Sequence, residues 1–135
     1  MIKVNIKRLS TAAFCVYLVA VAVLCFLKPS SLPEVRFTTI FGIPVDKLVH
    51  FLMFLPYPIL SGLSFMNRKL HIFVNMFILV ILVTTGAGIA YGTEVIQAQT
   101  GYRSYEIADF NADLAGIAVG AVCTFIGMLY IKLKK

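Results

Sequence analysis

The stretch GIAYGTEVIQAQTGYRSYEIADFNADLAGIAVG, residues 88–120, decides the fold of this chain. It contains four of the six acidic residues, although apolar sequence extends away from it on both sides. These four are Glu94, Glu106, Asp109 and Asp113. Charged groups so close to apolar spans are costly and are most often functional. We therefore expect a functional site here, with the apolar segments arranged around it.

The composition indicates a membrane protein. Hydrophobic residues make up 60% of the 135 residues and charged residues only 13%, whereas about 25% of the residues in an ordinary soluble domain are charged. There is too little polar surface to cover a water-soluble globule, so the bilayer must be the solvent for most of the chain. The length fits one domain, residues 1–135. We predict an all-α fold, a polytopic integral membrane protein with four transmembrane helices in a bundle.

Four apolar segments approach the length of roughly 20 residues that a transmembrane helix needs. The predicted spans cover about residues 9–27, 45–65, 70–98 and 105–131. Pro56 and Pro58 predict a kink inside the second span. Gly101 predicts the end of the third helix, and Ser104 predicts the N-cap of the fourth. A structural alternative for Asp46 is that it only caps the second helix, but capping does not account for Lys47 and His50 beside it.

Two further segments carry local signals. Residues 29–45 contain three prolines and a glycine, so we expect an interfacial loop there, with a short surface helix as an alternative. In the fourth span small residues recur at every fourth position, which lets another helix approach closely. This stripe consists of Ala108, Ala112, Gly116, Gly120 and Thr124.

The positions of the basic residues predict the orientation. The net charge of +6 does not indicate nucleic-acid binding, because the basic residues lie at the ends of apolar runs, as orientation signals do. One side carries eight of them, Lys3, Lys7, Arg8, Arg68, Lys69, Lys132, Lys134 and Lys135, and the other side four. We therefore predict a multi-pass protein of the bacterial cytoplasmic (inner) membrane with both termini cytoplasmic. All six acidic residues then lie on the outer side.

Three segments bring polar residues to that outer face. Spacings of three and four residues place polar side chains on one helix face at the start of the second span, and the same spacings recur at the outer ends of the third and fourth spans. An arginine lies in the turn between the last two. We predict that these residues form a shallow polar cup, open to the outer leaflet. Its members are Asp46, Lys47, His50, Glu94, Gln97, Arg103, Asp109 and Asp113.

The same motifs resemble a known family. The runs DKLVHF (residues 46–51), TEVIQ (93–97) and DFNADLAGIAVG (109–120), with Arg103 before the last, are similar to the VanZ-like family of small bacterial membrane proteins. The family pattern is Asp-Lys-x-x-His, Glu-x-x-Gln, a loop arginine, and an aspartate before a glycine-bearing span. Asp113 departs from it, because family members often carry asparagine there. The resemblance implies an association with reduced susceptibility to teicoplanin-type lipoglycopeptide antibiotics.

Three functions fit these residues. The first is binding of a lipid-linked or amphipathic ligand among the membrane lipids, with Lys47 and Arg103 meeting its phosphate or carboxylate groups. The second is an enzyme on such a lipid, with Glu94 or Asp109 as general base and His50 as acid–base partner. The third is a structural membrane subunit or transporter-like element, in which a network of ion pairs ties three helix ends together. The members of that network would be Asp46, Lys47, Glu94, Arg103 and Asp109. No cofactor is predicted. His50 and its acidic neighbours would suit a divalent metal, but without HExxH or paired CxxC motifs no metal is assigned.

Overall fold

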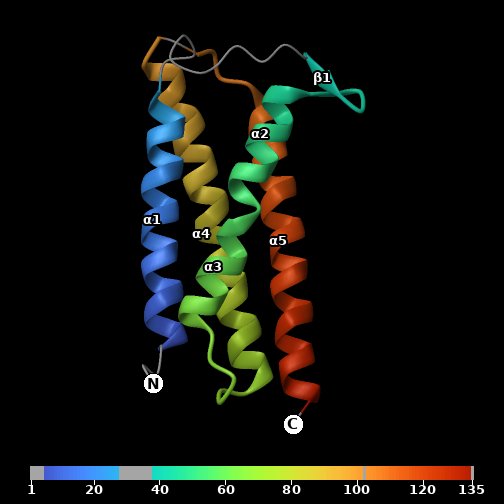
Figure 1. Ribbon diagram of the computed structural model, residues 1–135. Helices are drawn as coiled ribbons and strands as arrows, with labels where there is room; N and C mark the ends of the chain where they lie inside the picture. Colours follow the sequence, from blue (N-terminus) through green and yellow to red (C-terminus); the bar gives the residue numbers. More distant parts are fainter. Residues whose placement is uncertain (1–4, 28–37, 102, 135) are drawn as a thin grey trace.

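The computed structural model describes residues 5–27, 38–101 and 103–134, and it consists mainly of helices lying side by side (Figure 1). The elements in chain order are α1 (Ile6–Phe26), β1 (Thr39–Ile40), β2 (Ile43–Pro44), α2 (Val45–Phe54), α3 (Pro56–Phe65), α4 (Ile72–Gln99) and α5 (Ile107–Leu133). Helices α2 and α3 follow one another directly and form one rod. The predicted all-α fold is therefore confirmed, apart from a two-stranded hairpin.

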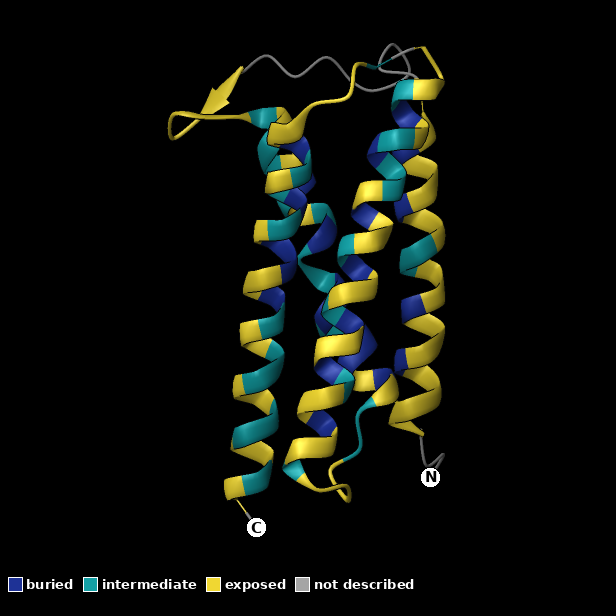
Figure 2. Cartoon of the chain, turned by 180° about the vertical axis from the view of Figure 1, so that it is seen from behind, coloured by how far each residue is buried: buried dark blue, intermediate teal, exposed yellow. Residues whose placement is uncertain are grey.

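Within the described ranges, four helical rods are long and apolar enough to cross a membrane: α1, α2 with α3, α4 and α5. Their ends differ from the predicted span limits by at most three residues. Buried positions face the inside of the bundle, and exposed positions cover the outside (Figure 2). The outward positions include large apolar side chains such as Val16, Phe77 and Val122. An apolar outer surface of this kind indicates a multi-pass membrane protein.

The predicted kink lies at Leu55, between α2 and α3. Pro56 occupies the first turn of α3, where its missing N–H is not needed. Leu55 keeps right-handed helical dihedral angles, φ −57° and ψ −41°, so the rod continues through the break. The two prolines thus interrupt the helix without ending the span.

The glycines of α5 lie against this interrupted rod. A Cβ atom at Gly116 would overlap the carbonyl oxygen of Phe51, and a Cβ atom at Gly120 would overlap the carbonyl oxygen of Leu55. Only a residue without a side chain leaves room for main-chain atoms at this distance. Close helix approach is therefore confirmed at Gly116 and Gly120 of the predicted small-residue stripe.

The structure supports neither the predicted N-cap at Ser104 nor the alternative of a cap at Asp46. Pro44 precedes α2 with extended dihedral angles, and Asp46 lies in the first turn with no side-chain capping bond. Strand β2 runs directly into the helix, so the helix starts before Asp46. Glu106, not Ser104, precedes α5, because the chain stays extended up to that residue. The end of α4 agrees with the prediction, since Gly101 has a positive φ of 73° just beyond the helix.

The hairpin occupies part of the predicted interfacial loop, and residues 28–37 lie outside the described residues. Ile40 pairs with Ile43 across a tight turn, in which Phe41 and Gly42 both have positive φ, 51° and 78°. The side chain of Phe41 is fully exposed at the tip. The described part of the predicted loop therefore forms a strand pair and not a surface helix.

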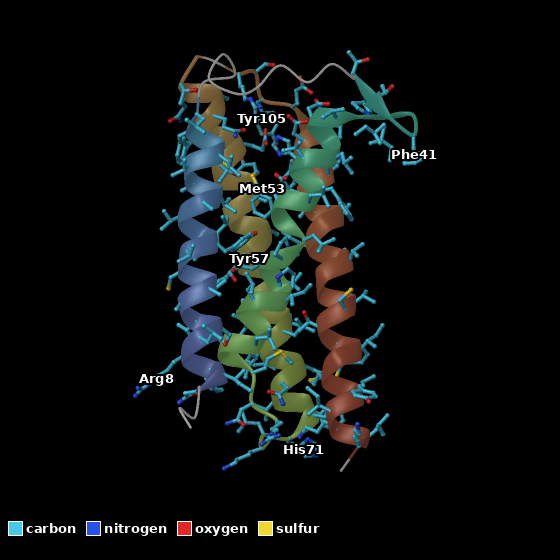
Figure 3. The ribbon with its side chains drawn as sticks, viewed as in Figure 1. Arg8, Phe41, Met53, Tyr57, His71 and Tyr105 are labelled. Atoms are coloured by element: carbon cyan, nitrogen blue, oxygen red, sulfur yellow. The ribbon has the colours of Figure 1, made fainter. Side chains whose placement is uncertain are left out.

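The two ends of the bundle differ in charge. The hairpin, the start of α2, the end of α4 and the start of α5 lie at one end, called here the acidic end (Figure 1). Both termini and the turn between α3 and α4, with Arg68 and Lys69, lie at the other, called here the basic end. Arg8 and His71 mark the basic end, and Tyr105 and Phe41 mark the acidic end (Figure 3).

Candidate functional site

The acidic end brings together side chains from three helices. Helix α2 supplies Lys47 and His50, α4 supplies Glu94, and α5 supplies Asp109 and Asp113. Each lies near the end of its helix at the spacing that the sequence predicted. We distinguish an inner cluster, His50, Glu94, Asp109 and Asp113, from an outer cluster, Asp46, Lys47 and Glu106.

The inner cluster is centred on His50. Its Nδ1 atom is 2.9 Å from Asp113 Oδ1 and 3.6 Å from Glu94 Oε1, and its Nε2 atom is 3.5 Å from Asp109 Oδ2. The exposed fractions are 3% for His50, 2% for Glu94 and 0% for Asp113. One imidazole therefore faces three carboxyl groups in a space closed to solvent by the helices themselves.

Two oxygen atoms of the inner cluster are buried without a hydrogen-bond partner in the described part of the chain, Glu94 Oε1 and Asp113 Oδ2. Buried polar atoms are nearly always paired in folded proteins, because an unpaired one costs about 1–3 kcal/mol. A functional role, a water molecule or a bound ion can each account for such an atom. These two oxygen atoms are therefore available to accept a hydrogen bond or to bind a cation, in addition to the ion pairs within the inner cluster.

The outer cluster is centred on Lys47. Its ammonium group is 2.8 Å from Asp46 Oδ2 and 2.6 Å from Glu106 Oε2, and it also contacts Asp109 Oδ1. Asp109 thus joins the two clusters through its two oxygen atoms. The side chains of Asp46 and Glu106 are about half exposed, whereas that of Lys47 is 18% exposed. The surface that the outer cluster presents is therefore mainly carboxylate.

This geometry changes the expected role of Lys47. The sequence suggested that its ammonium group would meet a phosphate or carboxylate of a ligand. In the structure three carboxylates of the protein already occupy the donor positions of that group. An anionic ligand would have to displace them, so a ligand with donor groups fits this surface better.

Two of the predicted cup residues lie apart from both clusters. Gln97 is buried, and its Nε2 atom donates a hydrogen bond to the Cys25 carbonyl oxygen at 3.0 Å. It therefore ties α4 to α1. Arg103 is half-buried and makes no ion pair with either cluster among the described residues. The prediction placed Gln97 with Glu94 because they are three residues apart, but that rotation turns Gln97 toward α1.

Glu106 is a site residue that the sequence reasoning did not include. Its position does carry a signal: Glu106, Asp109 and Asp113 are spaced three and four residues apart, the pattern of one helix face. Read as one face, this pattern would have grouped Glu106 with the two aspartates. Its backbone lies just outside α5, where the side chain still reaches Lys47.

The predicted cup is not an open recess. Its deepest members are almost fully buried, because they fill the space between the helix ends with their own side chains. A cavity of about 630 Å³ does exist, but at the basic end, where Gly62, Met66 and Thr124 help line it and no residue of the two clusters does. Only the outer cluster is accessible to a ligand without rearrangement.

No protein-family model matches the chain, and neither the curated proteins nor the solved structures include a match. The similarity to the VanZ-like family therefore rests on the motifs quoted above.

Proposed function

We propose that this chain is a VanZ-like protein of the bacterial cytoplasmic membrane, which binds a lipid-linked or amphipathic envelope ligand at its acidic end. The observation that carries the proposal is the buried group of His50, Glu94 and Asp113 beneath the half-exposed carboxylates of Asp46 and Glu106. Polar clusters at the ends of membrane-length helices lie near the lipid headgroups. A ligand there can keep its acyl chain in the bilayer while its polar part meets the outer cluster.

The chemistry of the outer cluster favours a particular kind of polar group. Carboxylates accept hydrogen bonds and attract cations, and Lys47 is already surrounded by three of them. The groups that fit are therefore amines and sugar hydroxyls. The association with reduced susceptibility to teicoplanin-type lipoglycopeptides enters this proposal only through the motif resemblance.

The orientation belongs to the same proposal. The excess of lysine and arginine at the basic end supports a cytoplasmic position for both termini. In a chain whose three cysteines, Cys15, Cys25 and Cys123, are replaced by serine, we expect Tyr105→Cys to react with a membrane-impermeant maleimide added to intact cells. We expect Lys69→Cys to react only after the cells are permeabilised. Labelling in the opposite order would contradict the proposed orientation and place the acidic end in the cytosol.

A second candidate function is catalysis on such a lipid. Glu94 Oε1 is buried 3.6 Å from His50 Nδ1 and has no hydrogen-bond partner in residues 5–27, 38–101 and 103–134. A carboxylate next to an imidazole that is itself held by Asp113 has the arrangement of a general base with its acid–base partner. In this reading the ligand would displace the outer carboxylates and reach Glu94. Glu94 would then remove a proton from the ligand and pass that proton to His50.

The variants Glu106→Gln and Glu94→Gln separate these functions, since each keeps the size of the side chain and removes its charge. If the chain binds a lipid at the outer cluster, we expect Glu106→Gln, which removes a half-exposed carboxylate there, to reduce retention of bacterial envelope lipids at least tenfold, as measured by mass spectrometry of the lipids that co-purify in detergent. If Glu94 is a base, wild-type protein converts a lipid, and Glu94→Gln retains that lipid without converting it. Unchanged lipid retention with a lower melting temperature would show a structural network and contradict both functions.

A further inference from the structure

The inner cluster places the donor atoms of three residues around one point. One donor atom each from His50, Glu94 and Asp109 lies within 4.8 Å of the other two. We propose that these residues bind a divalent transition-metal ion. The proposal concerns the same end of the bundle as the lipid ligand, but it does not require that a lipid be bound.

The unpartnered oxygen of Glu94 is an independent indication of a ligand. The residue is 2% exposed, and its Oε1 atom is directed at the imidazole without a hydrogen-bond partner among the described residues. Leaving a carboxylate oxygen both desolvated and unpaired is costly. This oxygen lies 3.6 Å from His50 Nδ1, and a metal ion at Nε2 would supply its missing partner once the carboxylate turns toward Asp109.

The orientation of His50 suits metal binding. Its Nδ1 atom is 2.9 Å from Asp113 Oδ1, and a metal-bound histidine commonly donates one ring N–H to a carboxylate in this way. The other nitrogen, Nε2, then faces Asp109 Oδ2 at 3.5 Å. Two donors that each lie about 2.1 Å from one tetrahedral ion are about 3.4 Å apart. The observed separation is longer than a hydrogen bond and close to this value.

Charge supports the same assignment. Asp109 accepts a hydrogen bond from Lys47 through its Oδ1 atom, and its Oδ2 atom faces His50 Nε2. It can therefore pair with Lys47 and bind the metal ion at the same time. The two clusters together contain five carboxyl groups but only one ammonium group and one imidazole. A divalent cation between Glu94 and Asp109 would offset the excess negative charge in a place that water reaches poorly.

The donor set selects the class of metal. An imidazole nitrogen suits zinc and the neighbouring transition metals, whereas magnesium and calcium prefer oxygen donors alone. One imidazole with two carboxylates therefore fits Zn²⁺ or Mn²⁺. In this arrangement Asp113 is a positioning residue, because it holds the imidazole and does not itself reach the ion.

The test uses the full chain, purified in detergent through a tag without histidines, treated with EDTA and dialysed against ZnCl2, MnCl2, MgCl2 or CaCl2. We expect one Zn²⁺ or Mn²⁺ per chain by elemental mass spectrometry, and a higher melting temperature in the same metal. Glu94→Gln should weaken binding at least 100-fold. Asp113→Asn, which still accepts a hydrogen bond from His50, should weaken it about 10- to 100-fold.

The matched control is His71→Ala, which removes the exposed histidine of the basic end and should leave metal binding unchanged. The proposal is overturned if no metal binds stoichiometrically, or if His71→Ala and Glu94→Gln lose the same amount of metal. Tighter binding of Mg²⁺ or Ca²⁺ than of Zn²⁺ and Mn²⁺ would also overturn it. Metal binding without retention of envelope lipids would support this inference and contradict the proposed function, so the two can fail separately.

Discussion

Replacing Gly116 with alanine is expected to lower the free energy of unfolding by about 2–3 kcal/mol, as overpacking of a close contact does. The new Cβ atom would overlap the carbonyl oxygen of Phe51 and lie 3.1 Å from the Leu55 nitrogen. Both are main-chain atoms, so no side chain can rotate away and the two rods must move apart. The measurement is the thermal midpoint at which the detergent-solubilised chain loses its monodisperse size-exclusion peak.

Helix α5 offers a matched control for this substitution. A Cβ atom at Gly127 would have no neighbour within 4 Å, so Gly127→Ala should be neutral or stabilise the helix by up to about 1 kcal/mol. Because Gly116 lies close to Asp113 in α5, and Phe51 follows His50 in α2, Gly116→Ala should also weaken metal binding. Equal thermal midpoints for the two variants would show that the rods do not pack as described.

Removing the imidazole of His50 should have the largest effect on stability, a loss of about 3–5 kcal/mol, as is typical when one partner of a buried ion pair is deleted. His50→Ala leaves the carboxyl group of Asp113 fully buried without its partner at 2.9 Å, and it also removes the imidazole that lies 3.6 Å from Glu94 Oε1. Thermal unfolding in the presence of EDTA measures this loss without any contribution from bound metal.

Two further variants test the physical reason for this effect. His71→Ala removes an exposed histidine whose side chain accepts a 3.4 Å hydrogen bond from the Phe73 N–H at the start of α4, so it should cost about 1 kcal/mol or less. The double variant His50→Leu with Asp113→Leu replaces the buried pair by apolar groups and should recover much of the loss. If His50→Ala is as stable as the wild type, the inner cluster does not hold α2 against α5.

The sequence predicted the location of the inner cluster because helix geometry fixes it. Once His50, Glu94, Asp109 and Asp113 are placed on membrane helices, their distance from the helix ends sets their depth, and their spacing sets their face. The break at Leu55 followed from two prolines, and the close packing at Gly116 from the spacing of small residues. These features depend on local rules that act within one helix.

The features that the sequence did not predict depend on how neighbouring helices are placed. Gln97 bonds to the main chain of α1, and no local pattern in α4 says which helix lies beside it. The contact of Glu106 with Lys47 depends on the path of residues 103–106, which lie outside the helices. The hairpin was not predicted, because its strands have only two residues each and are too short to show a pattern in the sequence. Its turn also places Phe41 at a positive φ, which is uncommon for a residue other than glycine.

The length of α4 bears on how deep the bundle lies in a bilayer. Its 28 residues extend about 42 Å, whereas a hydrocarbon layer is about 30 Å thick. Because α4 is longer than the hydrocarbon layer is thick, Glu94 can lie outside the acyl chains. A second feature is needed to set the depth at which the bundle lies in the bilayer. The hairpin projects sideways at the acidic end (Figure 1) with Phe41 exposed at its tip. If the hairpin lies in the headgroup layer, it would limit how deep the bundle inserts and would keep the acidic residues outside the hydrocarbon layer.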